Sequence, residues 1–197
     1  MSVNYFEVDV AERESVPGAL ESLLDARGVA GVTDDGRLVA LLQVPPDTWA
    51  LAAKEDTPWW AQLQAVIAED PQIDPAVEMG GFVSAIPARS GFAQVIRARV
   101  TDRHAFQRML AADAEWLARE RPEIVGGALA WHGRDRFTLV VCFTDEASAR
   151  AGEAKNAESP GADIDQLMHD VSYDELRNPW TRPLLPARRV TDRADRK

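Results

Sequence analysis

Two stretches of the sequence decide the fold, because the second repeats the pattern of the first. Residues 31–44 read GVTDDGRLVALLQV, and residues 127–143 read GALAWHGRDRFTLVVCF. Each has a short apolar segment, a polar turn that contains glycine, and an arginine followed by a continuous apolar run, which is typical of a β-hairpin. The repeated hairpin predicts that the chain is built from two similar halves.

The segments that flank the hairpins follow one order in both halves. Alternating apolar and polar side chains indicate strands, and apolar stripes that follow a polar capping residue indicate helices. In the first half, a strand, a helix, the hairpin, a helix and a strand are expected at residues 5–10, 15–28, 29–44, 57–69 and 77–83. In the second half, the same elements are expected at residues 94–100, 101–121, 124–143, 146–153 and 171–176.

This order, β-α-β-β-α-β in each half, predicts an α+β fold made of two ferredoxin-like units. The expected boundaries are residues 1–86 for the first half and 91–180 for the second, and residues 187–197 form a charged tail that we expect to be disordered. A four-stranded sheet with both helices on one face leaves its other face bare. We therefore expect the two antiparallel sheets to pack face to face as an intrachain pseudo-dimeric α/β barrel.

The composition limits the partners and the compartment of the chain. The formal net charge of −10 argues against nucleic acid, whose phosphates would be repelled. Residues 1–88 carry 4 basic and 15 acidic side chains, whereas residues 89–197 carry 18 and 17, which fits either two halves that attract each other or a solvated acidic surface. A single cysteine, the lack of a basic and apolar leader, and the lack of an apolar run of about 20 residues predict a cytoplasmic protein that does not enter the membrane.

The first strand of each half carries charges of opposite sign at equivalent positions. Glu7 and Asp9 alternate with apolar residues in the first half, and Arg97 and Arg99 do so in the second. If the apolar residues face the helices, the four charged side chains face one another between the sheets. They then form either an internal set of salt bridges that pairs the halves or a polar pocket for an anionic or carbonyl-bearing small molecule. The reverse assignment of the strand faces is a third interpretation.

Aromatic residues and histidines supply further candidates. Trp131 and His132 lie at the tip of the second hairpin, where they belong either to a ligand site or to a solvated loop. His169 precedes the last strand and, with Tyr173, can reach the mouth of the barrel, where it would transfer a proton. His104 and the other two histidines are widely spaced and lack a metal-ligand pattern, so we expect no metal.

The second half also resembles a known family. The resemblance rests on residues 124–128 (IVGGA), the strand 137–143, residues 144–150 (TDEASAR) and residues 173–180 (YDELRNPW). These are similar to the dimeric α/β-barrel superfamily, in particular to its antibiotic-biosynthesis-monooxygenase-like members of the actinobacterial type. The resemblance covers about residues 91–180, and the first half is similar mainly in its element order and hairpin.

The resemblance implies a protein that binds a small aromatic or polyketide-like molecule and oxidises it as a cofactor-independent monooxygenase. In that interpretation His169 and Arg97 are the catalytic candidates, and the substrate-binding candidates are Arg99, Trp131, Tyr173, Glu7 and Asp9. No cofactor or metal is expected, and the chain is a monomer or a homodimer. The alternative is a non-catalytic binding or scaffold protein whose interior is filled by side chains. A cavity below about 300 Å³ would favour the alternative.

Overall fold

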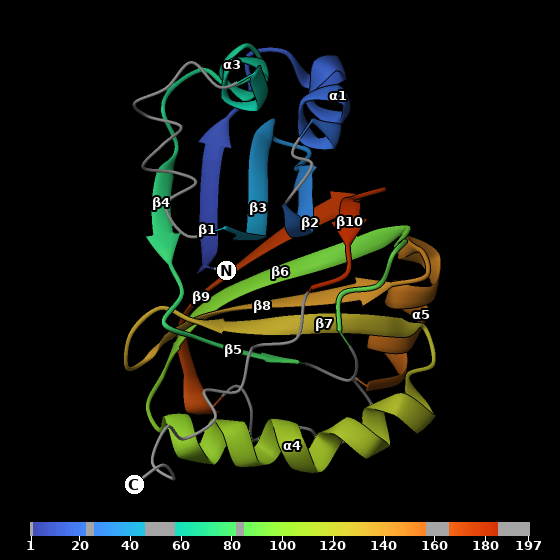
Figure 1. Cartoon of the computed structure of the whole chain (residues 1–197). Coiled ribbons are helices and arrows are strands. Elements are labelled where there is room, and N and C mark those ends of the chain that lie inside the picture. Colours follow the sequence, from blue (N-terminus) through green and yellow to red (C-terminus); the bar gives the residue numbers. More distant parts are fainter. Residues whose placement is uncertain (1, 23–25, 46–57, 82–84, 157–165, 185–197) are drawn as a thin grey trace, which may run out of the picture.

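The computed structural model describes residues 2–22, 26–45, 58–81, 85–156 and 166–184, which form two antiparallel five-stranded sheets with helices beside them (Figure 1). The tail expected at residues 187–197 lies outside this part of the chain. The strands are β1 Ser2–Asp9, β2 Arg27–Val32, β3 Arg37–Val44, β4 Gln72–Pro75, β5 Glu78–Gly81, β6 Phe92–Val100, β7 Ile124–Trp131, β8 Arg136–Phe143, β9 Met168–Arg177 and β10 Trp180–Arg182. The helices are η1 Arg13–Ser15, α1 Val16–Glu21, α3 Pro58–Gln64, α4 Arg103–Glu120 and α5 Glu146–Asn156.

Both predicted hairpins are confirmed. β2 pairs with β3 and β7 pairs with β8, each in antiparallel register. Gly36 and Gly133 occupy the two turns with φ of 90° and 104°, a conformation that glycine adopts without strain. The first sheet has the strand order β10-β2-β3-β1-β4 and the second has β5-β7-β8-β6-β9. The last four strands of each list correspond one to one, so the two halves arrange their own strands in the same order. The predicted α+β class is confirmed, and an origin by internal duplication stays a prediction.

The two halves exchange their edge strands. β5 lies at the end of the first half in the sequence but pairs with β7 of the second sheet, and β10 lies at the end of the second half but pairs with β2 of the first sheet. The crossing from β4 to β5 falls between two neighbouring residues. The amide of Ala76 donates to the carbonyl of Val3 at 2.8 Å, whereas the amide of Val77 donates to the carbonyl of Trp131 at 2.7 Å. The single strand expected at residues 77–83 is therefore replaced by two short strands that serve different sheets.

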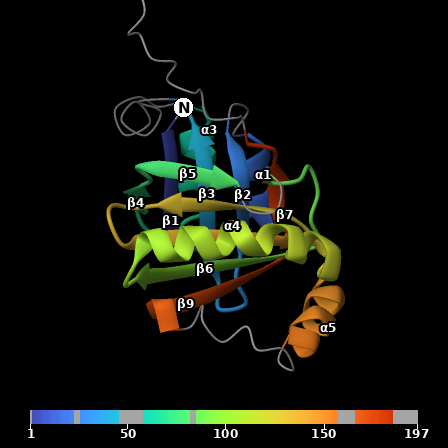
Figure 2. The same ribbon diagram turned by 90° about the horizontal axis from the view of Figure 1, so that it is seen from below.

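The helices cover the outer face of each sheet with apolar side chains. Val16 and Leu20 of α1 and Leu63 of α3 pack in one cluster with Phe6 and Leu38 of the first sheet. On the second sheet, α4 lies across the outer face (Figure 2), and its Phe106 packs in the cluster with Trp131 and Phe137. The Asp102 carboxylate caps α4 by accepting the amide proton of Ala105 at 2.9 Å.

A third apolar cluster joins the two sheets. It contains Tyr5, Val39 and Leu41 from the first sheet and Val95 and Val140 from the second, all buried. Burial of such a cluster removes apolar surface from water and holds the sheets together. The strand pairing nevertheless gives two separate sheets, and no closed barrel is formed by the strands of the described ranges. The pseudo-dimeric barrel packing stays a prediction.

Candidate functional site

The alternation of side chains along β1 and β6 places charged groups between the sheets. Phe6 belongs to the cluster under the helices of the first half, and its neighbour Tyr5 belongs to the cluster between the sheets. In β6, Ala98 packs on the helix side, whereas Val95 belongs to the cluster between the sheets. The predicted orientation of both strands is therefore correct. It brings Arg97, two positions after Val95, onto the face that is turned toward the first sheet.

Arg97 connects the two sheets through Glu7 and Tyr5. Its Nη1 donates to Oε2 of Glu7 at 2.9 Å and to the Tyr5 hydroxyl at 3.2 Å, and its guanidinium carbon lies 4.5 Å from the centre of the Tyr5 ring. The Tyr5 hydroxyl in turn donates to Oε2 of Glu7 at 2.9 Å. Burial raises the pKa of Tyr5 well above its usual range, so the phenol stays protonated and acts as a donor. The Nε and Nη2 groups of Arg97 make no hydrogen bond or ion pair with any residue in the described part of the chain.

Two further ion pairs cross between the sheets in a reciprocal way. Arg37 at the start of β3 contacts Asp174 of β9 at 2.7 Å, and Arg136 at the start of β8 contacts Asp74 of β4 at 3.0 Å. The two arginines are equivalent in the strand register, because Arg37 lies opposite Asp9 and Arg136 lies opposite Arg99. Each half therefore supplies an arginine to a carboxylate of the other half.

His132 lies beside the second of these ion pairs and is buried. Its side chain is 2% exposed, and its Nε2 lies 2.9 Å from Oγ1 of Thr138. Its Nδ1 lies 3.6 Å from Oδ1 of Asp74 and is a buried nitrogen without a hydrogen-bond partner in the described part of the chain. Burial lowers the pKa of His132, and the attraction of Asp74 only partly opposes this. The imidazole is therefore neutral at neutral pH.

A β-bulge shapes the opposite wall of the site. The register between β6 and β9 shifts between Arg97, which lies opposite Ser172, and Arg99, which lies opposite His169. Asp170 within this bulge has a φ of 52° and comes within 3.7 Å of Arg99. Bulges redirect side chains, and this one brings Asp170 to the site.

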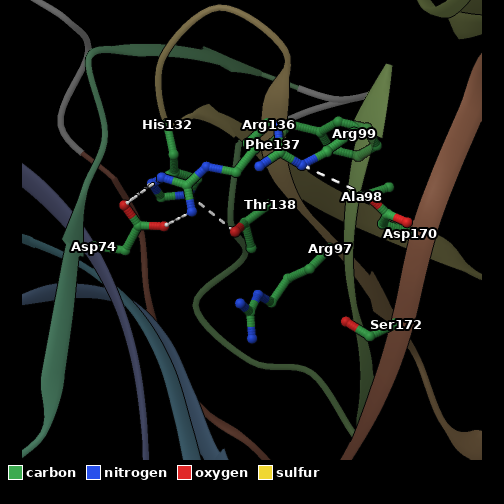
Figure 3. A pocket seen from close by; sticks show the side chains of 10 residues that line it. All are labelled: Asp74, Arg97, Ala98, Arg99, His132, Arg136, Phe137, Thr138, Asp170 and Ser172. Atoms are coloured by element: carbon green, nitrogen blue, oxygen red, sulfur yellow. Dashed lines mark hydrogen bonds and ion pairs between the residues drawn. The ribbon is translucent and has the colours of Figure 1, made fainter. Parts of the chain in front are cut away.

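These residues line two cavities that share part of their walls, and Figure 3 shows the lining of the smaller one. The smaller has a volume of about 170 Å³ and the larger about 500 Å³, and Asp74, Arg97 and Arg136 border both. The other lining residues of the smaller cavity are Ala98, Arg99, His132, Phe137, Thr138, Asp170 and Ser172. The other lining residues of the larger cavity are Tyr5, Glu7, Val8, Asp9, Arg37, Glu69, Asp70, Gln72 and Ile73. Among the described residues, no cluster of three or more His, Cys, Asp or Glu side chains is arranged to hold a metal ion.

Glu7, Asp9, Arg97 and Arg99, four of the predicted site residues, lie at these cavities. The expected pairing holds only in part, since Glu7 pairs with Arg97 whereas Arg99 pairs with Asp135 at 2.7 Å. Asp9 is exposed on the wall of the larger cavity.

Trp131, His169 and Tyr173, the other three predicted site residues, lie away from the described linings of the two cavities. Trp131 is 1% exposed and packs under α4 against Phe106 and Phe137, so the solvated-loop interpretation is wrong. Tyr173 is 59% exposed and lies opposite Ile96, on the helix side of the sheet. His169 is exposed near the start of β9. Their roles as site residues stay predictions.

The functional candidates that sequence reasoning missed are Asp74, Arg136 and Thr138. A signal for two of them was present, because period-two alternation along β8 places Arg136 and Thr138 on one face. The equivalence of Arg37 and Arg136 in the repeated hairpin was a second signal. No strand was expected at residues 72–75, so Asp74 carried no signal.

The fold is similar to that of proteins of known structure. It matches a candidate monooxygenase from Lactobacillus acidophilus NCFM with a TM-score of 0.63 and 8% identity, over 93% of this chain and 97% of that one. It also matches an uncharacterized ferredoxin-fold protein related to antibiotic biosynthesis monooxygenases from Listeria monocytogenes 4b F2365, with a TM-score of 0.56 and 10% identity over 90% and 95% of the two chains. A third match is an anthrone oxidase-like protein, with a TM-score of 0.56 and 11% identity over 94% and 96% of the two chains.

These identities are low, so the likeness shows the fold alone. No protein-family model matches the sequence, and no curated protein is significantly similar to it. None of the described helices has both the length and the apolar character needed to cross a membrane.

Proposed function

We propose that this chain binds a small aromatic molecule with an anionic or carbonyl oxygen in the two adjoining cavities and oxidises it as a cofactor-independent monooxygenase. The observation that carries the proposal is the guanidinium of Arg97. It borders both cavities, and its Nε and Nη2 groups have no acceptor among the described residues. A guanidinium with unused donors beside a cavity is suited to bind an oxyanion.

The dimensions of the site support a ligand of this class. The larger cavity, at about 500 Å³, lies within the range of small-molecule sites, which begins at about 300 Å³. Its wall includes the apolar surfaces of Val8 and Ile73 and the ring of Tyr5, against which an aromatic body can pack. The smaller cavity adds the side chains of Arg99 and Thr138. The polar head of a ligand would bind near Arg97 and Arg136, with its rings in the larger cavity.

The chemistry follows from the class of substrate. An anthrone loses a proton from its ring methylene to give an enolate, whose electron-rich carbon can react with O₂. The balanced reaction converts anthrone and O₂ into anthraquinone and water, so the substrate supplies the electrons and no reductant is needed. Arg97 would stabilise the enolate oxygen, and such stabilisation of developing charge is the largest contribution to many enzymatic rates. The similarity in fold to an anthrone oxidase-like protein supports this choice.

The test uses anthrone as the probe, with O₂ uptake, binding and unfolding by urea as three readouts. In Arg97→Ala we expect binding to weaken at least tenfold and O₂ uptake to fall with it. Arg119→Ala is the matched control, because Arg119 is 71% exposed on α4 and should change neither. If wild-type protein binds anthrone without O₂ uptake, the oxidation is wrong and the binding function remains. If it neither binds nor oxidises anthrone, the proposal is wrong.

A second candidate function is a non-catalytic scaffold whose charged groups only pair the halves. The apolar cluster that fills the space between the sheets favours it, as do the ion pairs of Arg37, Arg97 and Arg136. In this case Arg97→Ala would lower the free energy of unfolding by about 1–2 kcal/mol, between the values for exposed and buried ion pairs, because its side chain is 35% exposed. The same variant would have no binding defect, because there would be no ligand.

A further inference from the structure

The surroundings of His132 are arranged for a charged imidazole, although burial keeps the ring neutral at rest. Thr138 of β8 contacts Nε2, and the carboxylate of Asp74 in β4 faces Nδ1. The other groups around the ring are Arg136, Arg97 and the Tyr5 ring, whose centre lies 6.3 Å from the imidazole. Arg136 holds both oxygens of Asp74, with its Nη2 at 3.2 Å from Oδ1 and its Nη1 at 3.0 Å from Oδ2. The carboxylate is thereby fixed in front of Nδ1 (Figure 3).

A neutral imidazole leaves this arrangement incomplete. It carries one N–H, so only one of its two nitrogens can donate. The separation of 3.6 Å between Nδ1 and Oδ1 of Asp74 exceeds a hydrogen bond, and Nδ1 makes no hydrogen bond of ordinary geometry with the described residues. The backbone carbonyl of Pro75, next to Asp74, also acts on the ring and favours its protonated form. A proton added to the ring would place an N–H group on both nitrogens. The Nε2–H group would then face Thr138 Oγ1 as its acceptor, and the Nδ1–H group would face the carboxylate of Asp74. The site thus has the acceptors that an incoming proton would require.

We propose that Thr138, His132 and Asp74 form a proton relay that accepts the acidic proton of the ligand bound beside Arg97; this rests on the proposed function. The Thr138 hydroxyl takes the ligand proton as its own proton moves to Nε2 of His132. The ring then donates Nδ1–H to Asp74, and the ligand is left as an anion next to Arg97. The charges balance, because the neutral ligand becomes an anion and the neutral imidazole of His132 becomes an imidazolium. No oxidant or reductant takes part in this step.

The order of hydroxyl, imidazole and carboxylate is that of the triad of serine hydrolases, but the hydroxyl has another role here. Thr138 is 1% exposed, and it lines the smaller cavity. Its position between the cavity and His132 suits a group that passes a proton. Contacts of this kind are often long in the free enzyme and shorten when substrate binds, which fits the 3.6 Å separation at Asp74.

The experiment uses 4-nitrophenol, because its anion absorbs visible light and its ionisation in the bound state can be followed directly. In the wild-type protein we expect bound 4-nitrophenol to ionise at a pH below that of the free phenol. NMR of the imidazole ring should show that His132 becomes protonated upon binding at pH 7. In Thr138→Val, which keeps the shape of the side chain, the apparent pKa of the bound phenol should rise by at least one unit, a tenfold loss, and His132 should stay neutral. Thr181→Val on β10 is the matched control.

The outcomes separate the relay from the proposed function. If Thr138→Val and His132→Gln bind and ionise 4-nitrophenol as the wild type does, the relay is wrong and the binding function remains. If the wild type binds neither 4-nitrophenol nor anthrone, the proposed function and the relay are both wrong. A purely structural role of His132 predicts lower stability in His132→Gln with no change in the ionisation of the bound phenol, and this outcome also overturns the relay.

Discussion

At the scale of single residues, the burial of His132 makes the stability of the protein depend on pH. Burial lowers the pKa of this histidine in the folded chain, with Arg136 and Arg97 acting in the same direction and Asp74 opposing them. In the unfolded chain the same ring titrates near its usual value of about 6.5. Below that pH the unfolded chain binds a proton that the folded chain does not yet bind, so the free energy of unfolding decreases as the pH falls. Above it, the contribution of His132 is complete.

We therefore expect the free energy of unfolding, measured with urea, to fall as the pH is lowered from 7 through the range just below 6.5. His132→Gln removes the titrating group, so its curve should be flatter over that interval. His104→Gln serves as the control, because His104 is exposed at the start of α4 and should retain the wild-type slope. Equal slopes in wild type and His132→Gln would show that burial of this ring does not govern the pH dependence.

The residues that could be predicted are those whose position follows from strand alternation alone. Glu7 and Arg97 were placed between the sheets because both strands alternate strictly, and their side chains meet at 2.9 Å. The partner of Arg99 could not be predicted, because Asp135 lies in the turn between β7 and β8, and a bulge in β9 brings Asp170 close as well. His132 was placed at a hairpin tip, where the sequence contains no sign that β4 of the other half would cover it.

At the scale of elements, β2 depends on a glycine that allows its backbone to approach β3. Gly28 has a φ of 133°, and a Cβ atom there would collide with the carbonyl oxygen of Leu41. We expect Gly28→Ala to lower the free energy of unfolding by about 2–4 kcal/mol, through backbone strain and the displacement of β3. Gly18→Ala is the matched control. Gly18 lies in α1, and no described atom outside its own stretch of helix comes within 4 Å of its Cβ position, so this change should stabilise by about 0.5–1 kcal/mol.

Urea unfolding of the two variants separates the conformation of Gly28 from a general effect of replacing glycine. If Gly28→Ala is as stable as the wild type, the close approach of β2 to β3 is not required.

Local pattern was enough to predict the hairpins, since turn residues and apolar runs are encoded within about fifteen residues of each other. It was not enough for β4 and β5. The chain passes from one sheet to the other between Ala76 and Val77, a switch that depends on the free edges of β1 and β7 rather than on the residues that switch. The pairing of β10 with β2 has the same origin, because its partner is distant in sequence.

At the scale of the whole molecule, the two halves depend on each other. Each sheet takes an edge strand from the other half, and the cluster that contains Tyr5, Leu41 and Val140 is buried only when the sheets meet. The ion pairs Arg37–Asp174 and Arg136–Asp74 run in both directions across the same boundary. The boundaries at residues 1–86 and 91–180 stay predictions, and whether the two units fold independently is a separate question.

We predict that neither half folds alone and that the two halves fold together. A protease site inserted at Ala88 of the full chain allows the folded protein to be cut into residues 1–88 and 89–197. Each separated piece would expose the apolar face of its sheet, and that sheet would lack the edge strand that the other piece supplies. We therefore expect neither piece to unfold cooperatively in urea. When mixed, they should regain cooperative unfolding at a midpoint that rises with concentration, as mass action requires. The uncut protein is the control, with a midpoint that does not depend on concentration.

Cooperative unfolding of residues 1–88 alone would mean that the exchanged strands and the shared core are not needed for folding, and that the halves are two independent domains. The residues around the cavities between the halves would then not be held in fixed positions, as the proposed site requires.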